Sequence, residues 1–100
     1  MNKKPSLDEI IKKLTSILPK LKEEYPISSL GIFGSYAKKS NTRTSDIDIL
    51  VEFKKPIGLK FFQLKEDLEI NLANRVDLTT RKALKAQLKN QILKEVITIE

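Results

Sequence analysis

Hydrophobic residues recur along the chain with two different spacings, and these spacings predict its secondary structure. The first is helical and forms an apolar stripe of seven residues: Leu7, Ile10, Ile11, Leu14, Ile17, Leu18 and Leu21. Ser6 and Glu9 stand at the start of this stripe in the positions of a capping box. We therefore expect a helix over residues 7–24, kinked or restarted at Pro19.

The second spacing is the alternation of a strand, and it is clearest in residues 46–53. There Ile47 and Ile49 face one way, while Asp46 and Asp48 face the other. Residues 28–33, 75–79 and 96–99 predict further short strands, and residues 34–37 a short helix. Helical spacing returns in residues 59–73 and 81–95, and the polar residues 38–45 predict a loop. This order predicts an α/β (α+β) fold, with helices packed on a small mixed sheet.

Composition limits the chemistry available to the chain. One hundred residues are the length of one domain, so residues 1–100 are expected to form a single unit. The absence of cysteine and histidine excludes disulfides, thiol nucleophiles, Ser-His-Asp triads and metal sites built on sulfur or imidazole. The net charge of +6 suits an anionic partner, although it equally describes a solvated basic surface. No apolar run approaches the ~20 residues of a membrane span, so we expect a cytoplasmic protein without a membrane partner.

Three aspartates on the predicted strands are candidate metal ligands. Asp46 and Asp48 project from one face of their strand, and Asp77 is the only acid of strand 75–79. If these strands are neighbours, three carboxylates converge, and a divalent cation relieves their repulsion. Oxygen ligands without histidine or cysteine select Mg²⁺ or Mn²⁺. Taken alone, Asp46 and Asp48 also fit an exposed pair of acids balanced by lysines.

Gly34 and Ser35 stand at a predicted strand-to-helix turn and are a candidate phosphate site. Glycine allows the backbone to approach a ligand closely, and the first N–H groups of a helix attract anions. Taken alone, a Gly-Ser pair equally describes an ordinary tight turn. Together with the three aspartates, it predicts a phosphate cradle beside a metal-binding cluster.

These motifs resemble the signature of the nucleotidyltransferase superfamily related to DNA polymerase β. That signature is a Gly-Ser pair, a spacer, Asp-x-Asp and a third aspartate on a later strand. Residues 31–38, 45–53, 75–80 and 83–96 are similar to the minimal nucleotidyltransferase (MNT) subfamily, the antitoxins of HEPN/MNT toxin–antitoxin pairs. The resemblance covers nearly the whole chain and implies the polymerase β-like nucleotidyltransferase fold.

The resemblance further implies a metal-dependent transfer of AMP from ATP to a hydroxyl, with release of pyrophosphate. It assigns Asp46 and Asp48 to two Mg²⁺ ions, with Mn²⁺ as the alternative metal. It assigns Asp77 to the ion that activates the acceptor hydroxyl, and Gly34 and Ser35 to the β- and γ-phosphates.

The resemblance also implies a partner, an all-helical HEPN ribonuclease toxin that is silenced when AMP is added to a tyrosine. Three alternatives stay open on the sequence. The acceptor hydroxyl can belong to a small molecule or a nucleic acid, the chain can be a non-catalytic module that binds nucleotide or a partner, or its charge can serve nucleic-acid binding. Direct nucleic-acid binding is not expected, because the basic residues of 81–95 lack the interleaved aromatic residues of single-strand binders.

Overall fold

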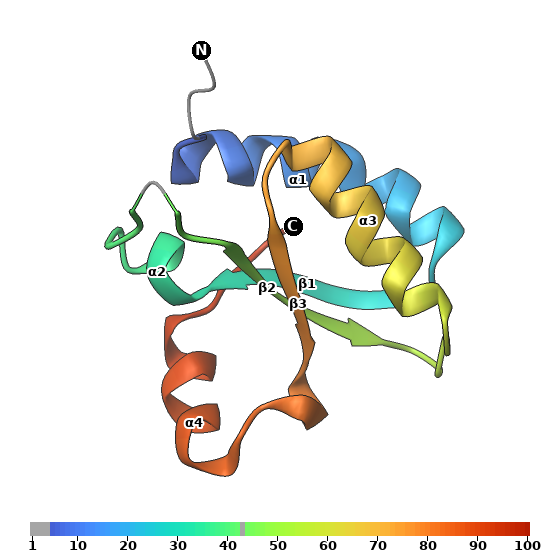
Figure 1. Ribbon diagram of the computed structural model, residues 1–100. Coiled ribbons are helices and arrows are strands. Elements are labelled where there is room, and N and C mark those ends of the chain that lie inside the picture. The colour runs from blue at the N-terminus through green and yellow to red at the C-terminus, as the bar shows by residue number, and fades with distance from the viewer. Residues whose placement is uncertain (1–4, 43) are drawn as a thin grey trace.

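The computed structural model describes residues 5–42 and 44–100 and shows helices packed on a four-stranded sheet (Figure 1). The elements are α1 (Leu7–Glu24), β1 (Ile27–Phe33), α2 (Gly34–Ala37), β2 (Ile47–Phe53), α3 (Lys60–Leu72), β3 (Val76–Thr80), the 3₁₀ turn η1 (Arg81–Ala83), α4 (Ala86–Glu95) and β4 (Ile97–Thr98). The predicted fold class is confirmed. Apart from the last predicted helix, each predicted element ends within a residue of its observed bounds.

Helix α1 begins with the expected capping box. The backbone N–H of Glu9 donates to the Ser6 hydroxyl (3.2 Å), and the N–H of Ser6 donates to the Glu9 carboxylate (3.1 Å). The helix continues through Pro19 as one element and ends before Pro26, in agreement with the predicted bounds. Neither α1 nor any other helix in the described part of the chain is long and apolar enough to cross a membrane.

The sheet has the strand order β3-β2-β1-β4. Strand β1 pairs antiparallel with β2 and β4, whereas β2 pairs parallel with β3. Helix α3 connects β2 to β3 and returns the chain to the end of the sheet from which β2 started, as a parallel pair requires. Helices α1 and α3 lie on one side of the sheet, and α4 lies on the other (Figure 1).

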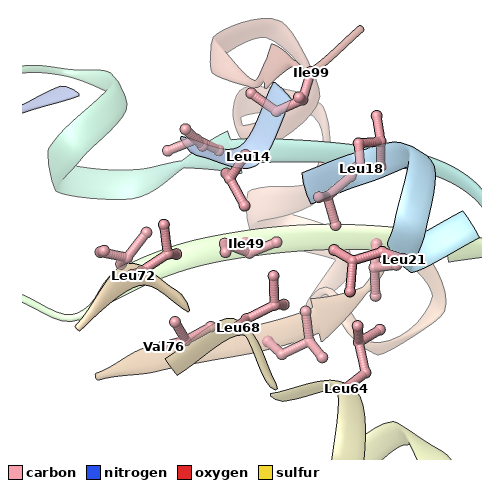
Figure 2. Packing of buried hydrophobic residues seen from close by; sticks show 14 of the residues in the cluster. Leu14, Leu18, Leu21, Ile49, Leu64, Leu68, Leu72, Val76 and Ile99 are labelled. Atoms are coloured by element: carbon pink, nitrogen blue, oxygen red, sulfur yellow. The ribbon is translucent and has the colours of Figure 1, made fainter. Parts of the chain in front are cut away.

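The core lies between the sheet and the pair of helices α1 and α3. Figure 2 shows Leu14 and Leu18 of α1, and Leu64 and Leu68 of α3, gathered around Ile49 of β2. All five side chains are buried. Since burial of a leucine or isoleucine side chain stabilises a fold by roughly 2 kcal/mol, this layer fixes the position of β2 and β3 under the helices.

The predicted helix over residues 81–95 is wrong in its first part. Arg81–Ala83 form a 3₁₀ turn, Leu84 and Lys85 are extended, and α4 begins only at Ala86. The break lets the chain leave the end of β3, pass over one face of the sheet as α4, and reach the opposite edge, where β4 pairs with β1 (Figure 1). The spacing of Leu84 and Leu88 continues the helical pattern across the break, so periodicity alone does not reveal it.

Tyr36 of α2 offers a test of the packing. It is fully buried, and its hydroxyl has no hydrogen-bond partner among the residues that the structure describes. A buried hydroxyl without a partner costs roughly 1–3 kcal/mol. Tyr36→Phe is therefore expected to raise the free energy of unfolding by about 1 kcal/mol, or Tm by about 4–8 °C, in thermal denaturation. A clear loss of stability would contradict this and indicate a buried water bound to the hydroxyl.

Candidate functional site

Asp48 and Asp77 are placed side by side by the parallel pairing of β2 with β3. The register sets Asp48 directly opposite Asp77. Ile47 and Ile49 on either side of Asp48 are buried beneath the helices, so alternation along the strand directs both carboxylates to the opposite face of the sheet. Asp48 is half-buried and Asp77 is exposed. The predicted convergence of the carboxylates depends on these two strands being neighbours, and in the structure they are neighbours.

Asp46 lies just outside this pair. It is exposed and precedes β2, which begins at Ile47 rather than at residue 46 as predicted. Asp46 is nevertheless near enough for its negative charge to act on Asp48. It therefore adds to the negative potential around the pair from the loop side of the strand.

The carboxyl group of Asp48 has an unusual proton affinity. Burial, together with the negative charges of Asp77 and Asp46 and a hydrogen bond to Asp77, raises the pKa of Asp48 from 3.8 to about 6. At neutral pH Asp48 is still ionised, although burial and the neighbouring negative charges disfavour its charged form. A bound cation would relieve both the repulsion and the cost of burial.

The donor set at this position fits a hard divalent cation held jointly with a ligand. In residues 5–42 and 44–100, no three acid side chains lie close enough together to enclose a metal ion, so the three predicted carboxylates do not form a closed cage. Mg²⁺ in nucleotide sites is held by one or two carboxylates, while substrate phosphates and water supply the other oxygens. Asp48 and Asp77 provide that pair of carboxylates, with Asp46 beside them.

Gly34 lies directly against Asp48. Strand β1 ends opposite Asp48, because Phe33 pairs with it, and the chain then turns sharply into α2. Gly34 has φ +72°, a left-handed conformation, and a Cβ built on it would strike Asp48 Oδ2 and lie 2.9 Å from Asp48 Cγ. The site thus requires glycine here for two reasons, the backbone conformation and the contact with the carboxylate.

Ser35 begins the turn that follows Gly34. Its carbonyl accepts a hydrogen bond from the N–H of Ser40 (2.9 Å), which closes the segment, and Ser35 itself is half-buried. No side chain caps the start of α2. The structure therefore brings the predicted Gly34-Ser35 turn against Asp48, and Asp48 against Asp77.

A fourth acid, Glu52, lies on the same face of β2 as Asp48. The alternation along the strand predicts this direction, but Glu52 was not among the predicted site residues. Its carboxylate accepts a hydrogen bond from the Ser29 hydroxyl (2.9 Å) and forms an ion pair with Arg81 (3.4 Å). The negative charge of Glu52 is therefore already balanced by Arg81, and Glu52 is not a candidate ligand for the cation.

The raised pKa of Asp48 predicts how stability depends on pH in the absence of a cation. Between about pH 4 and pH 6 the folded state keeps a proton that the unfolded chain releases, so the free energy of unfolding falls as the pH rises. Asp48→Asn removes this loss. We expect the variant to exceed the wild type by about 1 kcal/mol near pH 7.5, after allowance for solvent screening, and to match it near pH 4. Thermal denaturation in EDTA measures both, and an equal difference at the two pH values would contradict the assignment.

Comparisons with known proteins agree with this fold. A family model described as a nucleotidyltransferase domain matches residues 14–99. Protein adenylyltransferase MntA of Thermococcus cleftensis is 39% identical over 95 residues, which cover 94% of this chain and 96% of the relative. A solved structure assigned as a minimal nucleotidyltransferase superposes with a TM-score of 0.78 at 28% identity, covering 96% of this chain and 98% of that one.

A third comparison concerns a complex. It is the structure of a tri-AMPylated HEPN toxin of Shewanella oneidensis with its MNT antitoxin, and it contains a chain that superposes with a TM-score of 0.67. The match covers 91% of this chain and 71% of that chain, at 22% identity. At that identity the likeness shows a shared fold.

Proposed function

Because this chain belongs to the nucleotidyltransferase domain family, we propose that its single domain, residues 1–100, transfers AMP from ATP to a hydroxyl of another protein and so acts as an antitoxin. The chain is a nucleotidyltransferase. The observation that carries the rest of the proposal is the contact of Gly34 with Asp48, which in turn lies opposite Asp77. This arrangement sets a backbone turn suited to phosphate beside carboxylates suited to the counter-ion of phosphate.

Each residue has a distinct role in the proposed reaction. Gly34 and Ser35 hold the β- and γ-phosphates through backbone N–H groups and the Ser35 hydroxyl. Asp46, Asp48 and Asp77 would hold two Mg²⁺ ions, or Mn²⁺ in their place. When bound, these ions neutralise the charge of the triphosphate and make the acceptor hydroxyl more acidic. Asp77, exposed on the edge strand, is the carboxylate that an incoming acceptor meets and that takes the hydroxyl proton.

The reaction forms one bond and breaks one bond at the α-phosphorus of ATP. The acceptor oxygen attacks this atom, the bond from the α-phosphorus to its bridging oxygen breaks, and pyrophosphate leaves with the bonding electrons. No covalent intermediate on the chain is needed. The residues contribute by positioning the triphosphate and by balancing its charge, which is what this small site offers.

The proposed acceptor is a tyrosine of a HEPN-type toxin. Both tyrosines of this chain are buried, Tyr25 at 2% exposure and Tyr36 at 0%, so an acceptor tyrosine has to come from another molecule. The curated relative named protein adenylyltransferase supports a protein acceptor. The complex of an MNT antitoxin with a tri-AMPylated HEPN toxin supports the class of partner, since its matching chain shares this fold.

The experiment incubates the purified chain with Mg²⁺, ATP and the protein encoded beside its gene. We expect the intact mass of that protein to rise by one or more AMP units, located on tyrosine by peptide fragmentation, and its ribonuclease activity to fall. Omission of Mg²⁺ should prevent the change. AMP transfer to a small-molecule alcohol or a nucleic-acid end instead would overturn the protein acceptor. Toxin inhibition without any mass change would replace catalysis by simple binding.

A further inference from the structure

A groove of about 440 Å³ lies where β2 and β3 end. Because these strands are parallel, their carboxyl ends meet at the same end of the sheet, and the turns that follow them form the walls. The lining comes from two stretches of sequence: residues 51–56, at and after the end of β2, and residues 80–82, at and after the end of β3. Val51, Phe53 and Pro56 make part of it apolar, whereas its polar side chains are mostly basic.

The groove carries an excess of positive charge. Its lining includes Lys54, Lys55, Arg81 and Lys82 against a single acid, Glu52. Arg81 is paired with Glu52 at 3.4 Å. In residues 5–42 and 44–100, no acid lies within ion-pair distance of any of the three lysines, and all three are exposed. Three unpaired cations around a partly apolar groove favour an anionic ligand with some apolar surface.

The position of the groove relative to the acids suggests which ligand reaches it. Thr80 is three residues beyond Asp77 on the edge strand β3, a distance of roughly 10 Å along the strand. The Gly34-Ser35 turn lies at the opposite end of the strands, because Phe33 of β1 pairs with Asp48 while Ile27 pairs with Phe53. A triphosphate at Gly34 therefore leaves the groove free. A polypeptide that presents a hydroxyl at Asp77 can reach the groove with its next few residues.

We infer that this groove docks an acidic segment of the protein acceptor, a few residues away from the hydroxyl that receives AMP. The inference rests on the proposed function and adds the chemistry by which the acceptor is recognised. Carboxylates of the segment face Lys54, Lys55 and Lys82, and an apolar side chain packs on Phe53 and Pro56. Docking of this kind compensates for the small size of the domain, because it supplies binding energy away from the reacting atoms.

A nucleic acid suits the groove less well. Phe53 is the only aromatic residue in the lining, and its ring is only partly exposed. It also packs edge-on against Phe61, with ring centres 6.4 Å apart. Binding of single strands relies on open aromatic faces on which bases stack, and this groove offers none.

The test uses a fluorescein-labelled peptide with one tyrosine, flanked on both sides by a Gly-Gly-Ser spacer and a run of glutamates. The comparison peptide has glutamine in place of each glutamate. Binding is measured by fluorescence anisotropy with the wild type, with Lys54→Glu/Lys55→Glu/Lys82→Glu, and with Lys12→Glu/Lys13→Glu/Lys20→Glu. The second triple variant makes the same charge change at exposed lysines of α1, none of which lines the groove. Circular dichroism checks that both variants fold.

We expect the wild type to bind the acidic peptide at least tenfold more tightly than the glutamine peptide. The groove variant should lose at least tenfold in affinity, whereas the α1 variant should stay within about threefold of the wild type. Equal losses in both variants would show that only net charge matters and would overturn the inference. Single-stranded RNA serves as a competitor. If it displaces the acidic peptide when its concentration, counted in negative charges, is lower than that of the peptide, nucleic acid is the preferred ligand and the inference is overturned.

AMP transfer to the partner protein separates this inference from the proposed function. With the groove variant, KM for the partner should rise at least tenfold while kcat and ATP binding remain near wild type. An unchanged KM overturns the docking role and leaves the proposed function standing. If no variant transfers AMP to any protein but the peptide results are as expected, the proposed function fails and the acidic docking site stands.

Discussion

Replacing Asp48 by asparagine is expected to lower the rate of AMP transfer roughly a thousandfold while the protein stays folded. Asp48 is the half-buried member of the acid pair, it touches Gly34, and it lies opposite Asp77. Asparagine keeps its size but removes the charge that balances the triphosphate. Loss of that balance is worth several kcal/mol in the transition state, and about 4 kcal/mol corresponds to a factor of 10³. Initial rates of partner labelling with radioactive ATP measure the loss.

Two further variants make this prediction specific. Asp8→Asn makes the same chemical change at an exposed position of α1 and should leave the rate near wild type. Asp77→Asn should abolish transfer while it weakens nucleotide binding only a few-fold, because Asp77 lies on the exposed edge strand, where the acceptor arrives. A titration calorimeter follows Mg²⁺-ATP binding in each protein. Transfer by Asp48→Asn at more than a tenth of the wild-type rate would remove the acid pair from the mechanism.

The acid pair also lowers the free energy of unfolding of the cation-free protein at neutral pH, and the pH dependence of stability measures this loss. A group with a pKa raised to about 6 is ionised at neutral pH at the expense of folding. The same substitution that removes activity is thus expected to stabilise the cation-free protein. Such opposition between stability and activity is common where a site gathers like charges for a ligand that arrives later.

The sequence predicted those features of the fold that depend on neighbouring residues. The Ser6–Glu9 capping box, the apolar stripe of α1 and the alternation around Asp48 each follow from local spacing, and each is present in the structure. The break at Leu84 and Lys85 was missed because it serves a distant pairing, that of β4 with β1. Local periodicity does not show which distant strand the following segment pairs with.

The closeness of Gly34, Asp48 and Asp77 was predictable from the sequence only in part. Alternation predicted a common direction for Asp46 and Asp48, yet the register that sets Asp48 against Asp77 depends on how α3 returns the chain. The start of β2 at Ile47 leaves Asp46 outside the sheet. The basic groove was not predictable, because its lysines come from two separate stretches and each, taken alone, fits a solvated surface.

The second large effect is expected at Gly34. Alanine there would place a Cβ against the carboxylate of Asp48, 2.9 Å from its Cγ, so Asp48 has to turn away from its position beside Asp77. The new residue also has to adopt φ +72°, which costs about 1–2 kcal/mol for a residue other than glycine. We expect Gly34→Ala to fold, to lose about 1–2 kcal/mol of stability, and to transfer AMP roughly 100-fold more slowly. Thermal denaturation and initial labelling rates measure the two effects.

Gly58 separates the two causes, because it shares the backbone conformation of Gly34 without its surroundings. Gly58 has φ +59°, and a Cβ on it would meet nothing within 4 Å. Gly58→Ala should therefore lose about as much stability as Gly34→Ala and keep its activity. If both variants lose activity alike, strain in the fold explains the result and the contact with Asp48 does not. If only Gly34→Ala loses activity, and with it the binding of Mg²⁺-ATP, the glycine is required because it lies against the carboxylate.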